Sequence, residues 1–292
     1  MYTISQAAAR SGVAVALLRA WERRYGVVAP SRTPSGYRLY DDAAIARLRA
    51  MRALIDSGWS ASQAAEAVAT GSADAGVVEP GALEAGGAAG DQALVVAAST
   101  YDTAGIETAI DEILARGSYE AVIDDGLLPA VAALGTAWAA GRIDVAAEHL
   151  ASAAVQRRLA ALFDLGGRPR AERSVVVGLP PGCRHEIGTL AFAVALRRRG
   201  VDVLYLGPDT PVASWAHAAL DGHAVAAVIG VPRRADVGPA REVVAALAAS
   251  GQRLIVAIGG PAAGAVTDGP ARLLPVRVTD AAAALASVLA TD

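Results

Sequence analysis

The spacing of hydrophobic and polar positions changes several times along the chain, and each change marks a region. Residues 91–165 contain three stretches with apolar residues at helical spacing, and a shorter one precedes them. These stretches cover 102–116, 119–140 and 144–163, with the shorter one before Tyr101, and together they predict a four-helix bundle. From residue 174 to 292, short apolar runs alternate with helical patterns. The runs are Ser174–Leu179, Val203–Leu206, Val225–Val231, Leu254–Ile258 and Leu273–Val276, and a last helix is expected near Ala281–Leu289.

Five strand–helix repeats predict a doubly wound, five-stranded parallel sheet of the flavodoxin-like type over residues 174–292. Between the first 70 residues and the bundle, residues 71–90 are rich in glycine and alanine and have no periodicity. This composition predicts a flexible linker. The chain is therefore expected to combine α and α/β domains.

The first 70 residues follow a different pattern, with short helices and one alternating segment. Thr3 and Gln6 have capping-box spacing ahead of a helix that ends at Ser11-Gly12. A second helix is expected over Val13–Tyr25, with Leu17, Leu18 and Trp21 on its apolar side. Residues 34–40 then alternate like a short β wing, Asp41 caps a helix that runs to Asp56, and a fourth helix spans about 60–69. The order predicts a winged helix-turn-helix whose second helix enters the DNA major groove.

Charge supports this division. The first 70 residues contain nine arginines and five acidic residues, a formal charge of +4, which leaves −7 for the rest of a chain whose net charge is −3. A basic head on an acidic body is the pattern expected of a DNA-binding module. The single cysteine excludes an internal disulfide framework. We find no signal peptide and expect no membrane-spanning run, so a cytoplasmic location is expected.

His185 is the strongest candidate for site chemistry. It follows the first strand of the α/β region and precedes a helix, the position at which such folds bind ligands. In the bundle, Gly141-Arg142 breaks the chain between Trp138 and Glu148-His149, so these side chains are expected near one end of adjacent helices. An imidazole in one domain and a Trp/Glu/His group in the other indicate a cofactor held between them.

The head resembles the MerR family of transcription regulators. The residues that carry the resemblance are Leu18-Arg19-Ala20-Trp21-Glu22-Arg23-Arg24-Tyr25-Gly26 and Gly36-Tyr37-Arg38-Leu39-Tyr40. The resemblance implies that four arginines contact phosphates or bases and that two tyrosines contact the DNA backbone. These residues are Arg19, Arg23, Arg24 and Arg38, and Tyr25 and Tyr37. Trp21 is interpreted as a core residue.

The last region resembles the cobalamin-binding domain shared by corrinoid enzymes. His185 and Gly188 match the family's acid-x-His-x-x-Gly loop, Gly230-Val231-Pro232 occupies the middle segment, and Gly259-Gly260 matches the closing pair. The resemblance implies that His185 coordinates cobalt from below, in place of the cofactor's own base. The base and its tail would then lie beside the glycines.

The combination of head, bundle and cobalamin domain resembles the CarH type of light-sensing repressor. In that type, adenosylcobalamin promotes tetramer formation and binding to operator DNA in the dark, and light reverses both. The resemblance implies that Trp138 lies against the upper adenosyl group, with Glu148 and His149 near it. Both dimer and tetramer remain open for this chain.

Two positions depart from the family pattern. Cys183 stands where the family has an acid, which would bond the second imidazole nitrogen of the cobalt ligand. A thiol accepts such a bond weakly, and Glu186 is expected to point elsewhere. Cobalamin could then bind through its own base, or Cys183 could act as a soft ligand. Ala139 replaces a histidine that can capture cobalt after illumination, so no bis-histidine photoproduct is expected.

Two alternatives stay open. A regulator with the same head could sense another ligand, or act without cobalamin, because Cys183 alters the site. A corrinoid carrier for methyl transfer would share the last two domains, but the DNA-binding head disfavours it, as does Gly230 in place of the family's hydroxyl residue. No arrangement of catalytic residues is found, and we expect that the protein is not an enzyme.

Overall fold

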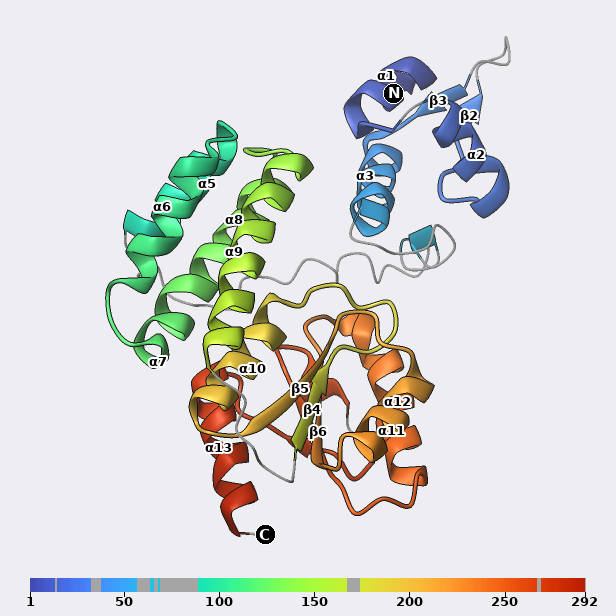
Figure 1. Ribbon diagram of the computed structural model, residues 1–292. Coiled ribbons are helices and arrows are strands. Elements are labelled where there is room, and N and C mark those ends of the chain that lie inside the picture. Colours follow the sequence, from blue (N-terminus) through green and yellow to red (C-terminus); the bar gives the residue numbers. More distant parts are fainter. Residues whose placement is uncertain are drawn as a thin grey trace. The chain divides into compact units, whose positions relative to one another are not determined.

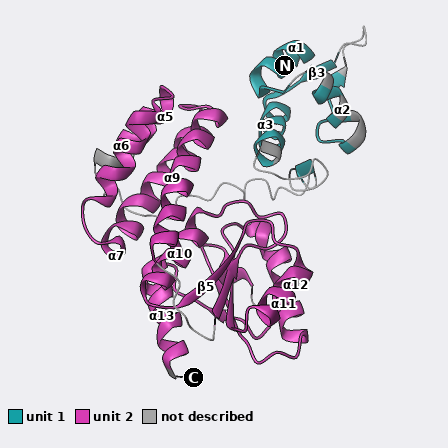
Figure 2. Ribbon diagram, viewed as in Figure 1, with its two compact units in different colours: residues 1–84 teal, residues 85–292 magenta. Residues whose placement is uncertain are grey.

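The computed structural model describes residues 1–13, 15–32, 38–56, 64–65, 68, 89–166, 174–266 and 269–291. The chain forms two compact units, residues 1–84 and 85–292 (Figure 2). Most of the expected linker, residues 71–88, lies outside the described residues, as does most of the expected fourth helix of the head.

The first unit has the helices and strands of a winged helix-turn-helix. Its elements are β1 (Tyr2–Thr3), α1 (Ile4–Ser11), α2 (Val15–Tyr25), β2 (Ser31–Arg32), β3 (Arg38–Tyr40) and α3 (Asp42–Asp56). The strands form an antiparallel sheet in the order β1-β3-β2. Of these strands, β3 lies within the expected wing, residues 34–40, whereas β1 and β2 were not expected from the sequence.

Local capping explains where the head helices begin and end. Thr3 and Gln6 form the expected capping box at α1, and Gly12 ends that helix with a φ of 70°. The Asp41 carboxylate accepts a hydrogen bond from the Ala44 backbone N–H (2.7 Å) at the start of α3. Trp21 is 3% exposed and belongs to the core, as expected, whereas Leu17 is 46% exposed. The placement of Leu17 on the apolar side of α2 was therefore wrong.

The four-helix bundle is confirmed in the second unit (Figure 1). Its elements are α5 (Ala89–Ser99), α6 (Thr103–Leu114), α7 (Tyr119–Val122), a π-helical turn (Ile123–Leu127), α8 (Leu128–Ala139) and α9 (Val145–Leu165). Elements α7 and α8 form one continuous helix interrupted by the π turn. Pro129, in the first turn of α8, has no backbone N–H, so the regular bond to the carbonyl of residue 125 cannot form.

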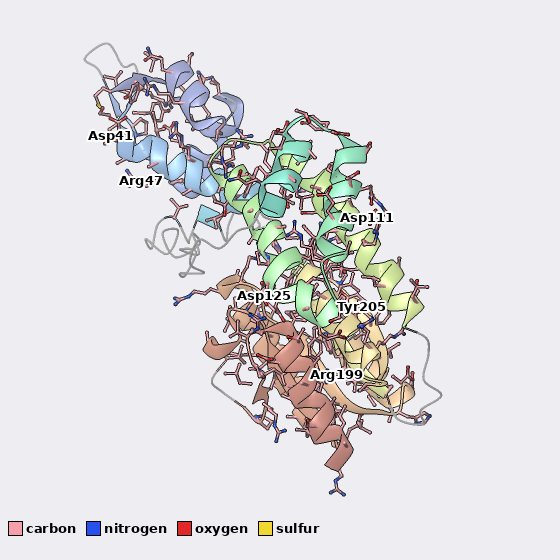
Figure 3. All side chains as sticks on the ribbon, turned by 90° about the vertical axis from the view of Figure 1, so that its left-hand side faces the viewer. Asp41, Arg47, Asp111, Asp125, Arg199 and Tyr205 are labelled. Carbon is pink, nitrogen blue, oxygen red and sulfur yellow. The ribbon has the colours of Figure 1, made fainter. Side chains whose placement is uncertain are left out.

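The π turn docks the bundle onto the last helix, α13 (Val278–Thr291). Asp124 accepts hydrogen bonds from the backbone N–H groups of Val278 (2.8 Å) and Thr279 (3.0 Å) and from the Thr279 hydroxyl (2.7 Å). Asp125 forms two bonds of 2.8 Å to the guanidinium of Arg277 (Figure 3). A carboxylate at a helix N-terminus accepts hydrogen bonds from the free N–H groups there. Its negative charge also interacts favourably with the positive end of the helix dipole.

The α/β part has the expected flavodoxin-like order, β5-β4-β6-β7-β8, with all strands parallel. The strands are β4 (Ser174–Gly178), β5 (Asp202–Gly207), β6 (Ala224–Gly230), β7 (Ile255–Gly259) and β8 (Arg272–Leu273). Helices α10 (Ile187–Arg198) and α13 cover one face, and α11 (Val212–Asp221) and α12 (Val237–Ala249) cover the other (Figure 1).

The bundle and the sheet share one hydrophobic core. It includes Leu134 and Leu159 of the bundle, Val175 and Val177 of β4, and Leu285 of α13. Polar contacts cross the same junction. The Tyr119 hydroxyl donates to the Ala191 carbonyl (2.7 Å), and the Arg197 guanidinium lies 3.5 Å from the centre of the Phe163 ring. The bundle is thus fixed on the α10 face of the sheet.

One helical segment of the described chain, Tyr119–Ala139, is long and apolar enough to cross a membrane by length and composition alone. No such run was expected from the sequence. The segment carries Asp124 and Asp125 in its π turn and contributes Ile123, Leu127 and Leu134 to the shared core. A core helix of a soluble bundle passes the same test, so this feature is weak support for a membrane location.

Candidate functional site

The strand order places the candidate residues at one edge of the sheet. Strands β5, β4, β6 and β7 are neighbours and parallel, so the loops after them meet at their carboxyl ends. His185 lies in the loop after β4, Gly230 ends β6, and Gly259 ends β7. The sheet thus gathers the three segments that carry the cobalamin-domain resemblance, as expected.

The loop after β5 holds the histidine loop on one side. The Asp209 backbone N–H donates to the Cys183 carbonyl (2.9 Å), and the Asp209 carboxylate accepts from the Gly182 N–H (2.7 Å). The Thr210 N–H donates to the Leu179 carbonyl (3.1 Å). These bonds fix the backbone ahead of His185 at three residues.

The loop after β6 approaches the same segment from the other side. Asp236 is only 4% exposed, and one of its carboxylate oxygens accepts the Arg233 backbone N–H (3.0 Å) and lies 3.5 Å from the Arg233 Nε. The Cys183 side chain is fully buried. Burial and the Asp236 carboxylate raise the pKa of Cys183 to about 12.

The His185 imidazole keeps an exposed surface although protein surrounds much of the side chain. Desolvation and then the Arg233 guanidinium lower the pKa of His185 to about 4, while Asp236 opposes them. The ring is therefore neutral at pH 7 and has a nitrogen lone pair for a metal. Glu186 points elsewhere, as expected, because its carboxylate accepts a hydrogen bond from the Tyr205 hydroxyl (3.0 Å).

The glycines at this edge are close to neighbouring backbone and side chains. A Cβ built on Gly230 would overlap the Thr189 hydroxyl, and one on Gly260 would lie 2.8 Å from the Val231 carbonyl oxygen. Gly260 also has a φ of 113°. The Val231 N–H donates to the Gly259 carbonyl (2.8 Å), which links the loops after β6 and β7. Gly188, in the first turn of α10, has open space where a side chain would be.

Trp138 and Glu148 lie at the same end of the bundle. The turn between α8 and α9 is closed by bonds from the Gly141 N–H to the Trp138 carbonyl and from the Arg142 N–H to the Ala137 carbonyl, each 2.9 Å. Trp138 is half-buried, and the Glu148 carboxylate accepts from the Ser152 hydroxyl (2.6 Å). The His149 side chain is 70% exposed, with its Nε2 3.8 Å from Glu148 Oε2. Ala139 is exposed.

Among the described residues, no three or more His, Cys, Asp or Glu side chains come together as a metal site. This donor set fits a corrinoid better than a free metal ion, because the corrin ring supplies four nitrogens and the protein needs to add one donor. His185 is such a donor, and Gly230, Gly259 and Gly260 lie at the ends of the neighbouring strands, at the same edge of the sheet. The residues present therefore fit cobalamin.

The expected DNA-binding residues are described only in part. Arg19 is exposed on α2. The Arg38 Nε donates to Glu22 (2.9 Å), and the Tyr40 hydroxyl donates to the other Glu22 oxygen (3.1 Å), so the wing strand is tied to the recognition helix. Tyr25 is half-buried at the end of α2. The side chains of Arg23 and Arg24, and Tyr37, lie outside the described residues.

Sequence reasoning missed three residues that shape the site, namely Asp209, Asp236 and Thr189. Asp209 has a φ of 52°, and an Asp after Gly-Pro in a strand-end loop was a usable indication of a turn. Asp236 lies 51 residues after His185, and only the adjacency of β4 and β6 brings the two loops together. Thr189 occupies the space next to Gly230.

Comparisons with known proteins agree with this geometry. Residues 2–70 match the model of the MerR HTH family regulatory protein, and residues 91–163 match that of the B12 binding domain. The chain is 35% identical to the HTH-type transcriptional repressor CarH of Myxococcus xanthus over 75% of each chain. It is 32% identical to the repressor CarA of the same organism, over 70% of this chain and 67% of CarA.

A solved structure supports the fold of the second unit. The monomethylamine corrinoid protein of Methanosarcina barkeri superimposes with a TM-score of 0.55 and 15% identity, covering 68% of this chain and 96% of that protein. The relatives in sequence are transcription regulators and not enzymes. The chain belongs to the CarH-type family of MerR regulators, which join a helix-turn-helix head to a cobalamin-binding domain.

Proposed function

We propose that this protein is a light-responsive transcriptional repressor that uses adenosylcobalamin as its chromophore. In the dark, the loaded protein assembles as a homo-oligomer, dimer or tetramer, and binds operator DNA in the cytoplasm. His185 is the lower cobalt ligand, and Trp138, Glu148 and His149 lie near the upper group. The observation that carries the proposal is the neutral, exposed imidazole of His185 at the sheet edge, in a segment that hydrogen bonds to the loop after β5 hold in place.

The chain's own residues have separate tasks in this proposal. When bound, adenosylcobalamin supplies the absorption of light and a light-sensitive cobalt–carbon bond. His185 offers a lone pair without first losing a proton, because its pKa is about 4. Gly230, Val231, Gly259 and Gly260 border the cofactor's tail. The exposed Arg19, with Arg23, Arg24, Tyr25, Tyr37 and Arg38, binds DNA phosphates and bases.

The test is made on the full chain purified in the dark with adenosylcobalamin. We expect a bound-cofactor absorption spectrum, an oligomer by light scattering, and DNA binding that illumination abolishes. His185→Ala should lose the cofactor, while His217→Ala serves as the control because His217 is exposed on α11. Retention by His185→Ala, or assembly and DNA binding that ignore light, would contradict the proposal.

A second candidate is a regulator of the same family that senses another ligand or acts without cobalamin. Cys183 in place of the family's acid favours it. It predicts that the wild-type chain retains no cobalamin in the same experiment, while its binding to operator DNA persists. A corrinoid carrier of a methyltransferase is the least supported reading, because the head matches a DNA-binding family.

A further inference from the structure

We infer that Glu22 is a positioning residue that directs Arg38 toward the DNA backbone, so that a carboxylate on the recognition helix strengthens DNA binding. This inference rests on the proposed contact between Arg38 and DNA, and not on the cobalt site. Charge alone would predict the reverse, because a negative side chain on a DNA-binding face repels phosphates.

The first support is the pair of hydrogen bonds that Glu22 accepts from the wing strand. One carboxylate oxygen accepts the Arg38 Nε–H (2.9 Å), and the other accepts the Tyr40 hydroxyl (3.1 Å). Residues two apart on a strand point to the same side, so β3 presents both donors to α2. A carboxylate with both oxygens bonded to one strand fixes that strand to the recognition helix.

The second support is the increase in exposure along these contacts. Tyr40 is fully buried in the core of the head, the Glu22 side chain is 17% exposed, and the Arg38 side chain is 35% exposed. The contacts therefore lead from the core outward and end at a guanidinium on the surface. Because the Tyr40 ring cannot move, the Glu22 carboxylate that it holds is a fixed point for Arg38.

The third support is the geometry of the guanidinium, which carries five N–H donors in a rigid plane. Glu22 takes the Nε–H of Arg38, and the two terminal nitrogens have no hydrogen-bond partner among the described residues. Those nitrogens form the edge that can bond two phosphate oxygens at once. One guanidinium can thus bond Glu22 and a phosphate together, and the carboxylate reduces the side-chain freedom that is lost on binding.

The experiment measures DNA binding by the full chain, in the dark with adenosylcobalamin. One DNA probe is a duplex that the wild-type chain has selected from a random pool, and the other is a duplex of unrelated sequence. Fluorescence anisotropy at several salt concentrations gives the affinity and its dependence on salt. The variants are Glu22→Gln, Arg38→Ala and the two combined. Asp42→Asn is the control, because it removes the same charge from the head at an exposed position on α3.

For Glu22→Gln we expect about tenfold weaker binding to both duplexes and a salt slope smaller by about one, because one phosphate contact is lost and such contacts carry no sequence information. Arg38→Ala should lose as much, and the combined variant should bind no more weakly than Arg38→Ala. Asp42→Asn should bind at least as tightly as the wild type. Three results would each overturn the inference: unchanged or tighter binding by Glu22→Gln, losses that add in the combined variant, or a loss confined to the selected duplex.

Arg38→Lys gives a second route if Glu22→Gln does not fold. Lysine keeps the positive charge but lacks the planar group that bonds a carboxylate and a phosphate together, so about tenfold weaker binding is expected. Wild-type affinity of Arg38→Lys would contradict the inference. DNA binding that ignores light would overturn the proposed function, and the comparison of variants would still decide the role of Glu22. A wild-type chain that selects no duplex would overturn both.

Discussion

The residues expected below and above the cofactor are held in different ways. Below, Cys183 is fully buried, and the loop after β5 bonds to the segment that carries His185. Above, Glu148 bonds with Ser152 on its own helix, and the His149 side chain is 70% exposed. The segment that carries the lower candidate ligand is therefore held more tightly than the upper group. The two regions should respond differently to substitution.

The largest effect should appear in cysteine reactivity. At pH 8, Cys183 should react with iodoacetamide roughly two to three orders of magnitude more slowly than a cysteine at the exposed bundle end. The reason is that a pKa of about 12 leaves very little thiolate, the reactive form. The matched variant is Ala139→Cys with Cys183→Ser, which again has a single cysteine. Similar rates in the two folded proteins would remove the contrast between the regions.

Cofactor affinity tests the contrast directly. His185→Ala should weaken dark binding of adenosylcobalamin by about a hundredfold or more, because it removes the ligand itself and not only an outer partner. His149→Ala should change the affinity by less than about threefold, since an exposed side chain contributes little. Equilibrium dialysis followed by absorption measures both. A larger loss for His149→Ala than for His185→Ala would reverse the assignment of roles.

Substituting one glycine with positive φ in each region compares the regions by the change in the free energy of unfolding. Gly260→Ala should cost about 2–3 kcal/mol in the free energy of unfolding, because φ is 113° and the new Cβ lies 2.8 Å from the Val231 carbonyl oxygen. Gly141→Ala, at the bundle turn, has φ of 69° and nothing within 4 Å, so about 1 kcal/mol is expected. Urea denaturation of the full chain measures the difference. Equal costs would show that space at Gly260 is not limiting.

The smallest effect on stability is expected at Gly230, which stands where the family has a residue with a hydroxyl group. Gly230→Ser should destabilise the chain by about 1–2 kcal/mol, because its Cβ overlaps the Thr189 hydroxyl. In a Thr189→Ala background the same change should cost less than half as much. This double-mutant cycle is read from urea midpoints. An equal cost in both backgrounds would show that Thr189 and Gly230 do not share the space.

Local patterns made much of the fold predictable. The capping residues Thr3 and Asp41 and the five strands follow from short-range spacing, the strand order follows from the general rule for alternating strands and helices, and all were confirmed. The last strand was expected over 273–276, but β8 is Arg272–Leu273, because Pro275 cannot donate to the sheet. The π turn before Pro129 was not expected, because apolar periodicity does not distinguish a continuous helix from one with a widened turn.

The candidate site was predictable in its ligand and glycines and not in its supporting contacts. His185, Gly230 and Gly259 lie at strand ends, a position that the strand pattern gives directly. The position of the Asp236 carboxylate depends on the path of the loop after β6 and on a buried ion pair with Arg233. Such contacts follow from tertiary structure and have no signature in the spacing of residues along the chain.

The docking of the π turn has a consequence for the exchange of sensor modules. Asp124 and Asp125 belong to the bundle, yet they bond to Arg277, Val278 and Thr279 at the start of the last helix. A chimera that joins this bundle to the α/β domain of another protein would lose these bonds, although the cut between α9 and β4 looks natural. Recombination of such sensors should therefore transfer the bundle together with the first turn of the C-terminal helix.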